Sequence, residues 1–91
     1  MSIRESAIER KSMAWATSQG ALVLKVQGAK GWPDRLILKP SGKVMFVEFK
    51  RPGQTPNALQ AHMLQEIRRR GVLAYWAQSF ADFVKAYEQE Y

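Results

Sequence analysis

Residues 44–50 constrain the fold of this chain more than any other segment. They read Val-Met-Phe-Val-Glu-Phe-Lys, so apolar side chains occupy both faces of the segment until Glu48. A strand with two apolar faces is typical of the centre of a sheet that is covered on each side. The segment therefore predicts a central strand with helices on both faces, and it puts Glu48 and Lys50 at the end of that strand.

Glu48 and Lys50 stand two residues apart, so on a strand their side chains emerge on the same face. A carboxylate at the end of a buried strand is costly unless a partner compensates its charge. A metal ion would do so, and so would a salt bridge to Lys50 or to a neighbouring arginine. These residues alone leave both interpretations open.

Asp34 completes a candidate site. It stands shortly before the apolar residues 36–38, and residues 40–42 (Pro-Ser-Gly) predict a turn between them and the strand that contains Glu48. A hairpin with that turn brings Asp34 close to Glu48. The two carboxylates and Lys50 then have the spacing of a metal-dependent nuclease centre.

The chain has 91 residues, with no cysteine and one histidine. This length suits one domain, residues 1–91, with one hydrophobic core. The lack of cysteine excludes disulfides and thiolate metal sites, so a metal would be held by oxygen atoms or by the single histidine, which points to a hard cation. No apolar run approaches the ~20 residues of a membrane span, and the charged N-terminus is unlike a signal peptide. We therefore expect a soluble, cytoplasmic protein that does not bind membranes.

The formal net charge of +6 makes a polyanion a natural partner. Lys30, Arg35 and Arg51 lie beside the residues of the candidate site, and we expect them to bind DNA. The three arginines at residues 68–70 close a predicted helix, where they have a second interpretation. They could simply be favourable charges at a helix C-terminus.

The sequence predicts a helix near the N-terminus and two further strands. Ser2 and Glu5 form a capping-box pattern that opens a helix, and Gly20 ends this helix. Residues 22–26 and 72–77 read as strands because β-branched, aromatic and other apolar residues dominate them.

Two further helices complete the order of elements. Thr55 and Pro56 predict the start of a second helix that ends at Gly71, and Ser79 with Asp82 predicts the start of a third. The resulting order is α-β-β-β-α-β-α. It predicts an α/β fold in which a mixed central sheet is flanked by helices.

Gln60 lies within the apolar face of the second helix. The apolar residues of that face are Leu59, Met63, Leu64 and Ile67. The amide of Gln60 is therefore expected to point toward the core or toward the site. The alternative is a partly buried glutamine that bonds to the backbone.

Taken in order, these motifs resemble the VRR-Nuc family of the PD-(D/E)XK nuclease superfamily, and most closely its short, stand-alone, phage-type members. The resemblance covers nearly the whole chain and runs through Glu5-Ser6-Ala7-Ile8-Glu9, Gly31-Trp32-Pro33-Asp34-Arg35, Val47-Glu48-Phe49-Lys50, Leu59-Gln60 and Gly71. Trp32 departs from the family, which more often has a small or β-branched residue before the proline. The departure affects the shape of the loop rather than the ligands. A phage-type member would act in the cytoplasm of the host cell.

The resemblance implies a PD-(D/E)XK nuclease-like fold and a DNA endonuclease that depends on Mg²⁺ or Mn²⁺. It implies that Asp34 and Glu48 bind the metal together with the backbone carbonyl of Phe49. It also implies that Lys50 is the catalytic lysine, and Gln60 matches the helix glutamine of the family.

The acid of the first helix has two candidates. Glu5 matches the N-terminal glutamate of the family by its spacing to Gly20, whereas in similar archaeal junction resolvases the acid sits one turn later, where Glu9 stands. Helical geometry favours Glu5, because it lies closer to the stripe of Ile8 and Trp15. Glu5 could instead serve only the capping box.

One site per chain cannot make the two symmetric cuts that resolve a four-way junction. We therefore expect a homodimer that acts on branched DNA, as a Holliday junction resolvase does, and recognises its shape. The last helix could supply the dimer interface through Phe80, Val84, Tyr87 and Tyr91, or it could simply cover the sheet. The alternatives are a nuclease on duplex, flap or single-stranded DNA, and a DNA-binding subunit that does not cleave.

Four further side chains have a weaker claim to a role in the site. His62 has no second histidine to form a site with. Trp32, Tyr75 and Trp76 would either stack on bases or complete the core and its rim.

Overall fold

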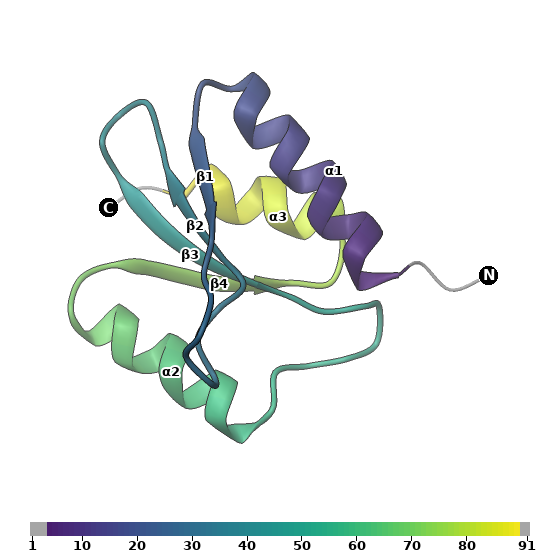
Figure 1. Ribbon diagram of the computed structural model, residues 1–91, viewed down its shortest axis with the longest axis vertical. Coiled ribbons are helices and arrows are strands. Elements are labelled where there is room, and N and C mark those ends of the chain that lie inside the picture. The colour runs from purple at the N-terminus through teal and green to yellow at the C-terminus, as the bar shows by residue number, and fades with distance from the viewer. Residues whose placement is uncertain (1–3, 90–91) are drawn as a thin grey trace.

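The fold contains three helices and four strands within residues 4–89, the part of the chain that the computed structural model describes. In chain order these are α1 (Glu5–Ser18), β1 (Leu22–Lys25), β2 (Arg35–Leu38), β3 (Val44–Phe49), α2 (Ala58–Arg69), β4 (Leu73–Ala77) and α3 (Phe80–Tyr87) (Figure 1). The predicted order α-β-β-β-α-β-α is confirmed. No helix among these residues has the length and apolar character needed to cross a membrane.

The four strands form one sheet in the order β1-β2-β3-β4. The pairs β1–β2 and β2–β3 are antiparallel, whereas β4 runs parallel to β3. A parallel pair needs a crossover connection, and α2 provides it. The predicted mixed sheet is therefore confirmed.

The hairpin of β2 and β3 brings Asp34 beside Glu48, as predicted. Arg35 lies opposite Val47 in the strand register, so the residues next to them, Asp34 and Glu48, are neighbours too. The turn closes where Lys39 donates its backbone N–H to a carbonyl across the hairpin at 2.8 Å.

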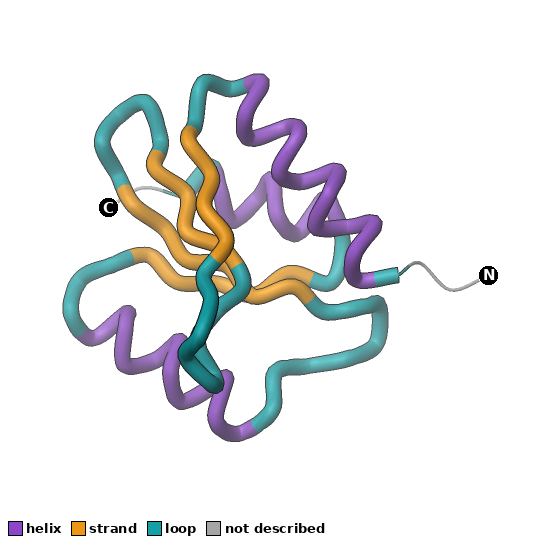
Figure 2. Tube along the Cα trace, viewed as in Figure 1, coloured by secondary structure: helices purple, strands orange, loops and turns teal. Residues whose placement is uncertain are grey.

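Helices cover both faces of the sheet, as Figures 1 and 2 show: α1 and α3 lie on one face and α2 on the other. Met45, Val47 and Phe49 of β3 are fully buried on the side of α1 and α3. Phe46 packs in the smaller cluster on the side of α2, and Glu48 follows on the same face. β3 is thus the covered central strand that its sequence predicts.

α2 packs mainly against β4 and leaves its face of the sheet open over β1 and β2. Leu22 and Leu24 of the edge strand β1 are 70% and 59% exposed on this face, and Leu38 and Val44 beside them are also exposed. Val23 points the other way and packs against the core. The sheet therefore carries an exposed apolar surface made of Leu22, Leu24, Leu38 and Val44, which we call the β1–β2 face.

α1 begins later than predicted. Its first helical residue is Glu5 and its N-cap is Arg4, which makes no side-chain hydrogen bond to the helix. The predicted capping box is wrong because Glu5 stands at the first helical position instead of the third, and Ser2 lies outside the described residues. The predicted end is confirmed, since Gly20 follows the helix with a φ of +92° that favours glycine.

α2 also begins at a different residue, because Asn57 and not Thr55 is its N-cap. The Oδ1 of Asn57 accepts the backbone N–H of Gln60 at 2.8 Å, and the Oε1 of Gln60 accepts the backbone N–H of Asn57 at 3.0 Å. This reciprocal pair satisfies two backbone donors at once, which a single cap at Thr55 would not do. Leu59 departs from the predicted apolar face: it is 42% exposed and lies over Gly31 rather than on the sheet.

α3 covers the sheet and packs against α1. The ring of Trp15 meets the rings of Phe80, Phe83 and Tyr87 edge-on, with centroid distances of 6.1, 6.2 and 5.0 Å. The aromatic side chains of α3 are thus engaged within the molecule, which favours the covering role over the dimer interface. Tyr91 lies outside the described residues.

Candidate active site

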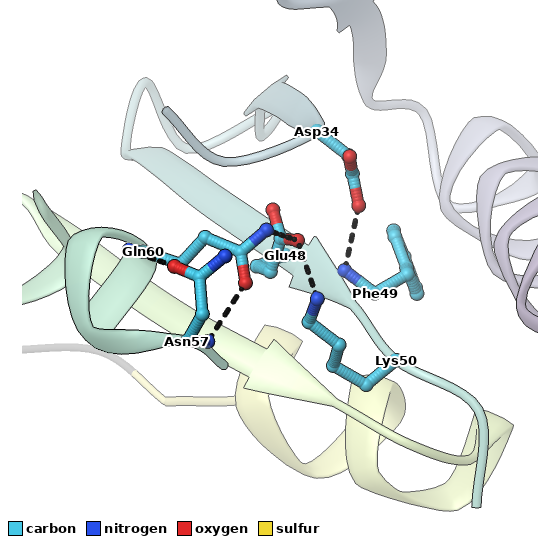
Figure 3. A network of polar contacts seen from close by, with 6 residues as sticks. All are labelled: Asp34, Glu48, Phe49, Lys50, Asn57 and Gln60. Atoms are coloured by element: carbon cyan, nitrogen blue, oxygen red, sulfur yellow. Dashed lines mark hydrogen bonds and ion pairs between the residues drawn. The ribbon is translucent and has the colours of Figure 1, made fainter. Parts of the chain in front are cut away.

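Four of the predicted site residues come together where β3 ends and α2 begins (Figure 3). Asp34 directly precedes β2, Glu48 lies in β3, Lys50 follows β3, and Gln60 lies in the first turn of α2. In Figure 3 the side chains of Lys50 and Gln60 both point toward the carboxylate of Glu48. The three segments that carry them are held by the β2–β3 pairing and by the packing of α2.

The carboxylate of Glu48 is buried, and its two oxygens have different surroundings. Its Oε2 accepts a hydrogen bond from the Nε2 of Gln60 at 3.0 Å and lies 3.5 Å from the Nζ of Lys50. Its Oε1 is buried without a hydrogen-bond partner among residues 4–89. A buried carboxylate oxygen without a partner is costly, so this atom is a candidate ligand for a cation.

The burial of Glu48 favours its protonated form. Desolvation by burial, assisted by the charges of Asp34 and Glu5, raises the pKa of Glu48 from its ordinary value of 4.5 to about 7, although Lys50 opposes the rise. The cost of keeping a second negative charge beside Asp34 is thus only partly offset by Lys50. A divalent cation at this position would remove that cost.

Asp34 is held in a fixed orientation. Its Oδ2 accepts the backbone N–H of Phe49 at 2.8 Å, so the carboxyl lies against the end of β3. Burial raises the pKa of Asp34, and the charge of Glu9 raises it further, whereas the Phe49 hydrogen bond and the charges of Lys50 and Lys25 lower it. Asp34 and Glu48 are therefore neighbouring carboxyls whose pKa values are both raised.

The donor set fits a hard cation of the Mg²⁺ or Mn²⁺ type. Carboxylate oxygens are its preferred protein ligands, and Mg²⁺ is commonly held by one or two carboxylates with the rest of its shell supplied by waters and substrate phosphates. Across the described part of the chain, no three His, Cys, Asp or Glu side chains are grouped closely enough to hold a metal by themselves. Asp34 and Glu48 would thus be the main protein ligands, and the carbonyl of Phe49 stays a predicted one.

Glu5 and Glu9 on α1 are both partly buried near this site, but they have different partners. Glu9 pairs with Arg35, with a distance of 2.6 Å between Oε2 and Nε, so its carboxylate is already compensated. Glu5 contributes to the raised pKa of Glu48. Glu5 is therefore the better placed of the two to approach Glu48, and its role as a ligand stays a prediction.

The three residues predicted to bind DNA differ in availability. Lys30, in the loop between β1 and β2, and Arg51, directly after β3, are exposed. Arg35 is only partly exposed because it pairs with Glu9 and so ties β2 to α1. Lys30 and Arg51 are the better candidates for phosphate contacts.

The arginines at residues 68–70 serve the structure of α2. Arg69 and Arg70 pair with Glu66, at 3.0 and 3.2 Å. Arg68 donates to the carbonyl of Ala74 and lies over the ring of Tyr75. These contacts support the structural interpretation of the cluster.

The remaining candidates lie outside the group formed around Glu48. His62 is exposed on α2 and forms no group of metal-binding side chains within residues 4–89. Trp32 packs edge-on against Phe46 and is 39% exposed. Tyr75 and Trp76 pack against the two core clusters. The aromatic residues thus complete the core and its rim.

Asn57 was missed by the sequence analysis although its side chain caps the residue that contacts Glu48. The signal was present: Asn57 and Gln60 have the spacing of a capping box.

Two sequence comparisons relate the chain to known proteins. The family model of the VRR-NUC domain matches residues 4–81. The protein named "Putative nuclease p44", from Acyrthosiphon pisum secondary endosymbiont phage 1, is 40% identical over 60 residues. This alignment covers 64% of the chain and 64% of the length of that phage protein.

Two solved structures share the fold. A VRR-NUC domain superimposes with a TM-score of 0.82 at 29% sequence identity, over 96% of this chain and 97% of that one. A VRR-NUC domain protein superimposes with a TM-score of 0.76, over 98% of this chain and 88% of that one, and at 14% identity this likeness concerns the fold alone. The predicted nuclease-like fold is confirmed by these neighbours.

Proposed function

Since the chain belongs to the VRR-NUC domain family, we propose that it is a divalent-metal-dependent DNA endonuclease that hydrolyses phosphodiester bonds at the site around Glu48. The observation that carries this proposal is the buried Oε1 of Glu48, which has no hydrogen-bond partner in the described part of the chain, beside the carboxyl of Asp34. A purely structural salt bridge between Glu48 and Lys50 leaves that oxygen unexplained. A cation held by both carboxylates accounts for it.

Each residue of the site then has a distinct task. Asp34 and Glu48 would hold Mg²⁺ or Mn²⁺, with Phe49 through its carbonyl and Glu5 as further proposed ligands. The bound cation would supply Lewis-acid polarisation of the scissile phosphate. The ammonium group of Lys50 lies 3.5 Å from Glu48, where it would stabilise the negative charge that develops on the phosphate in the transition state.

A cleavage assay with two variants tests this proposal. Asp34→Ala and Glu48→Ala should still bind DNA, because the exposed basic residues are unchanged, and should not cleave it with either metal. Glu66→Ala serves as the control, since Glu66 pairs with Arg69 and Arg70 on α2 and lies outside the site. Undiminished cleavage by both site variants would refute the assignment.

For the substrate, we propose branched DNA and in particular four-way junctions. Lys30 and Arg51 are exposed and would contact phosphates, which position DNA without reading its sequence. A protein that holds DNA through such contacts would recognise the shape of the DNA rather than its sequence. The rival substrates are duplex, flap and single-stranded DNA.

A homodimer would supply the two symmetric cuts that a junction requires. The aromatic side chains of α3 pack against Trp15 and are therefore poor candidates for its interface. The β1–β2 face is the better candidate, because Leu22 and Leu24 expose large apolar side chains there. Contiguous exposed apolar side chains are typical of sites of association.

Cleavage of a junction, a flap and a plain duplex of the same sequence separates these substrates. A dimer that cuts the junction fastest would support the proposed activity. A monomer that cuts duplex as readily as junction would refute it. A protein that binds all three and cuts none in Mg²⁺ or Mn²⁺ would be a DNA-binding subunit with a nuclease fold.

A further inference from the structure

We propose that Asn57 is a positioning residue for the site around Glu48, acting through Gln60. This inference rests on the proposed function, because it concerns how Glu48 is presented to a cation. Asn57 is exposed and is the N-cap of α2. Through Gln60 it connects the start of α2 to the orientation of the Glu48 carboxylate.

The link begins with the reciprocal hydrogen bonds at the start of α2. The side-chain Oδ1 of Asn57 accepts the N–H of Gln60 at 2.8 Å, and the side-chain Oε1 of Gln60 accepts the N–H of Asn57 at 3.0 Å. Each residue thus holds the backbone of the other. The side chain of Gln60 is fixed at its oxygen end.

Fixing the oxygen of the Gln60 amide also fixes its nitrogen. The Nε2 of Gln60 donates to the Oε2 of Glu48 at 3.0 Å. A flipped amide would set its NH₂ group against the N–H of Asn57 and its oxygen against the carboxylate of Glu48, and both contacts would be repulsive. The capping box and the contact with Glu48 therefore select the same orientation.

The hydrogen bond from Gln60 to Glu48 decides which carboxylate oxygen of Glu48 remains for a cation. The Oε2 is occupied by the amide of Gln60 and by the ion pair with Lys50, whereas Oε1 has no hydrogen-bond partner among the described residues. An outer residue that holds a ligand in one orientation reduces the cost of ordering it when the metal binds. Asn57 performs this task one step removed. Its backbone N–H binds the Oε1 of Gln60, and its side-chain Oδ1, by accepting the N–H of Gln60, holds that backbone N–H in place.

The test compares the loss of two helix caps. Asn57→Ala removes the side-chain acceptor of the α2 cap and leaves the backbone N–H that binds Gln60, but without the acceptor that holds it in place. Ser79→Ala removes the equivalent cap of α3, where the Ser79 hydroxyl accepts the N–H of Asp82 at 3.0 Å as its sequence predicts. Asn57→Gly is the second variant, since glycine is a tolerated N-cap without a side-chain acceptor. Asn57→Ser restores an acceptor.

Two readouts are needed. The first is the position of the ¹H–¹⁵N signals of the Gln60 side-chain amide in the metal-free protein. The second is the affinity for Mn²⁺, measured by calorimetry.

Asn57→Ala and Asn57→Gly should move the Gln60 signals toward those of a free amide and weaken Mn²⁺ binding by about tenfold, the lower end for residues that orient a ligand. Asn57→Ser should recover most of both, and Ser79→Ala should change neither. The proposal is overturned if the Asn57 variants keep the wild-type signals and affinity, or if Ser79→Ala loses as much affinity. A wild-type protein that binds no Mn²⁺ would refute the proposed function, while the Gln60 signals would still report on Asn57.

Discussion

Glu48 is the central residue of the site because it is a charged side chain in a buried, apolar position. It lies on a central strand whose other side chains are apolar, and it is 3% exposed. Lys50 compensates part of its charge, so the salt bridge considered from the sequence exists. It leaves Oε1 without a hydrogen-bond partner in residues 4–89, which is why a salt bridge alone is an incomplete account.

The raised pKa of Glu48 predicts that the metal-free protein loses stability as the pH rises. The folded pKa of about 7 exceeds the ordinary value of 4.5, so between these values the folded protein binds the extra proton. The contribution of Glu48 is therefore fully present below about pH 4.5 and is lost as the pH rises through about 7, with a magnitude of roughly 3 kcal/mol. Urea unfolding in a chelator at pH values from 4.5 to 8 measures it.

Glu48→Gln is the matched variant for this prediction, since its amide does not titrate. Its unfolding free energy should vary less with pH than that of the wild type, and it should be the more stable of the two at pH 8 without metal. Equal slopes for the two proteins would show that Glu48 does not titrate in this range.

At the scale of single residues, the sequence predicted Asp34, Glu48 and Lys50 as one group because strand alternation and hairpin register are local rules. Gln60 was added from its place on the apolar face of α2 and from its match to the helix glutamine of the family. The sequence could not predict which oxygen of Glu48 is left unpaired. That depends on the contact with Gln60, which joins β3 to α2.

At the scale of elements, the starts of two helices were mispredicted. In α1 the first helical residue is Glu5, after an N-cap that makes no side-chain hydrogen bond. In α2 two local patterns compete to cap the helix. Thr55 and Asn57 are both good caps by residue type, but only Asn57 has a glutamine three residues later whose side chain can bond back. Strand positions were easier, since short runs of apolar and β-branched residues between turn residues mark them.

The loop before Asp34 is fitted to α2 through a glycine. Gly31 has a φ of +84°, and a Cβ there would lie 2.5 Å from the Cγ of Leu59. Gly28 in the same loop has a φ of +86° but no atom within 4 Å of its Cβ position. Both glycines therefore have a positive φ, but only Gly31 has a neighbouring side chain, Leu59, in the way of a Cβ.

Gly31→Ala should destabilise the protein more than Gly28→Ala. Both variants incur about 1–2 kcal/mol from the left-handed backbone. Gly31→Ala adds about 1–3 kcal/mol because Leu59 must move. Chemical denaturation of the two proteins measures the difference, and equal losses would mean that the Leu59 contact does not constrain the loop.

At the scale of the whole molecule, the sheet is covered unevenly. α1 and α3 cover one face, whereas α2 leaves the β1–β2 face open. The sequence predicted helices on both faces but could not predict the gap, because the extent of cover depends on where α2 crosses the sheet. The prediction that residues 1–91 form a single domain stays a prediction.

The exposed β1–β2 face leads to a prediction about dimer formation. If two copies meet there, the wild type should have about twice the 10.4 kDa mass of the chain in light scattering. Leu24→Glu should reduce it to one copy, because a charge would be buried in the interface. Gln65→Glu, which adds the same charge on the exposed side of α2, is the control. A dimer that tolerates Leu24→Glu would place the interface elsewhere.

The most direct test of the metal site is a calorimetric titration of the metal-free protein with Mn²⁺. The wild type and Glu66→Gln should bind the ion with equal affinity, whereas Asp34→Asn and Glu48→Gln should bind it at least about tenfold more weakly, because each variant replaces a charged ligand. Wild-type affinity in both site variants would contradict the account, since the two carboxylates would then hold no cation.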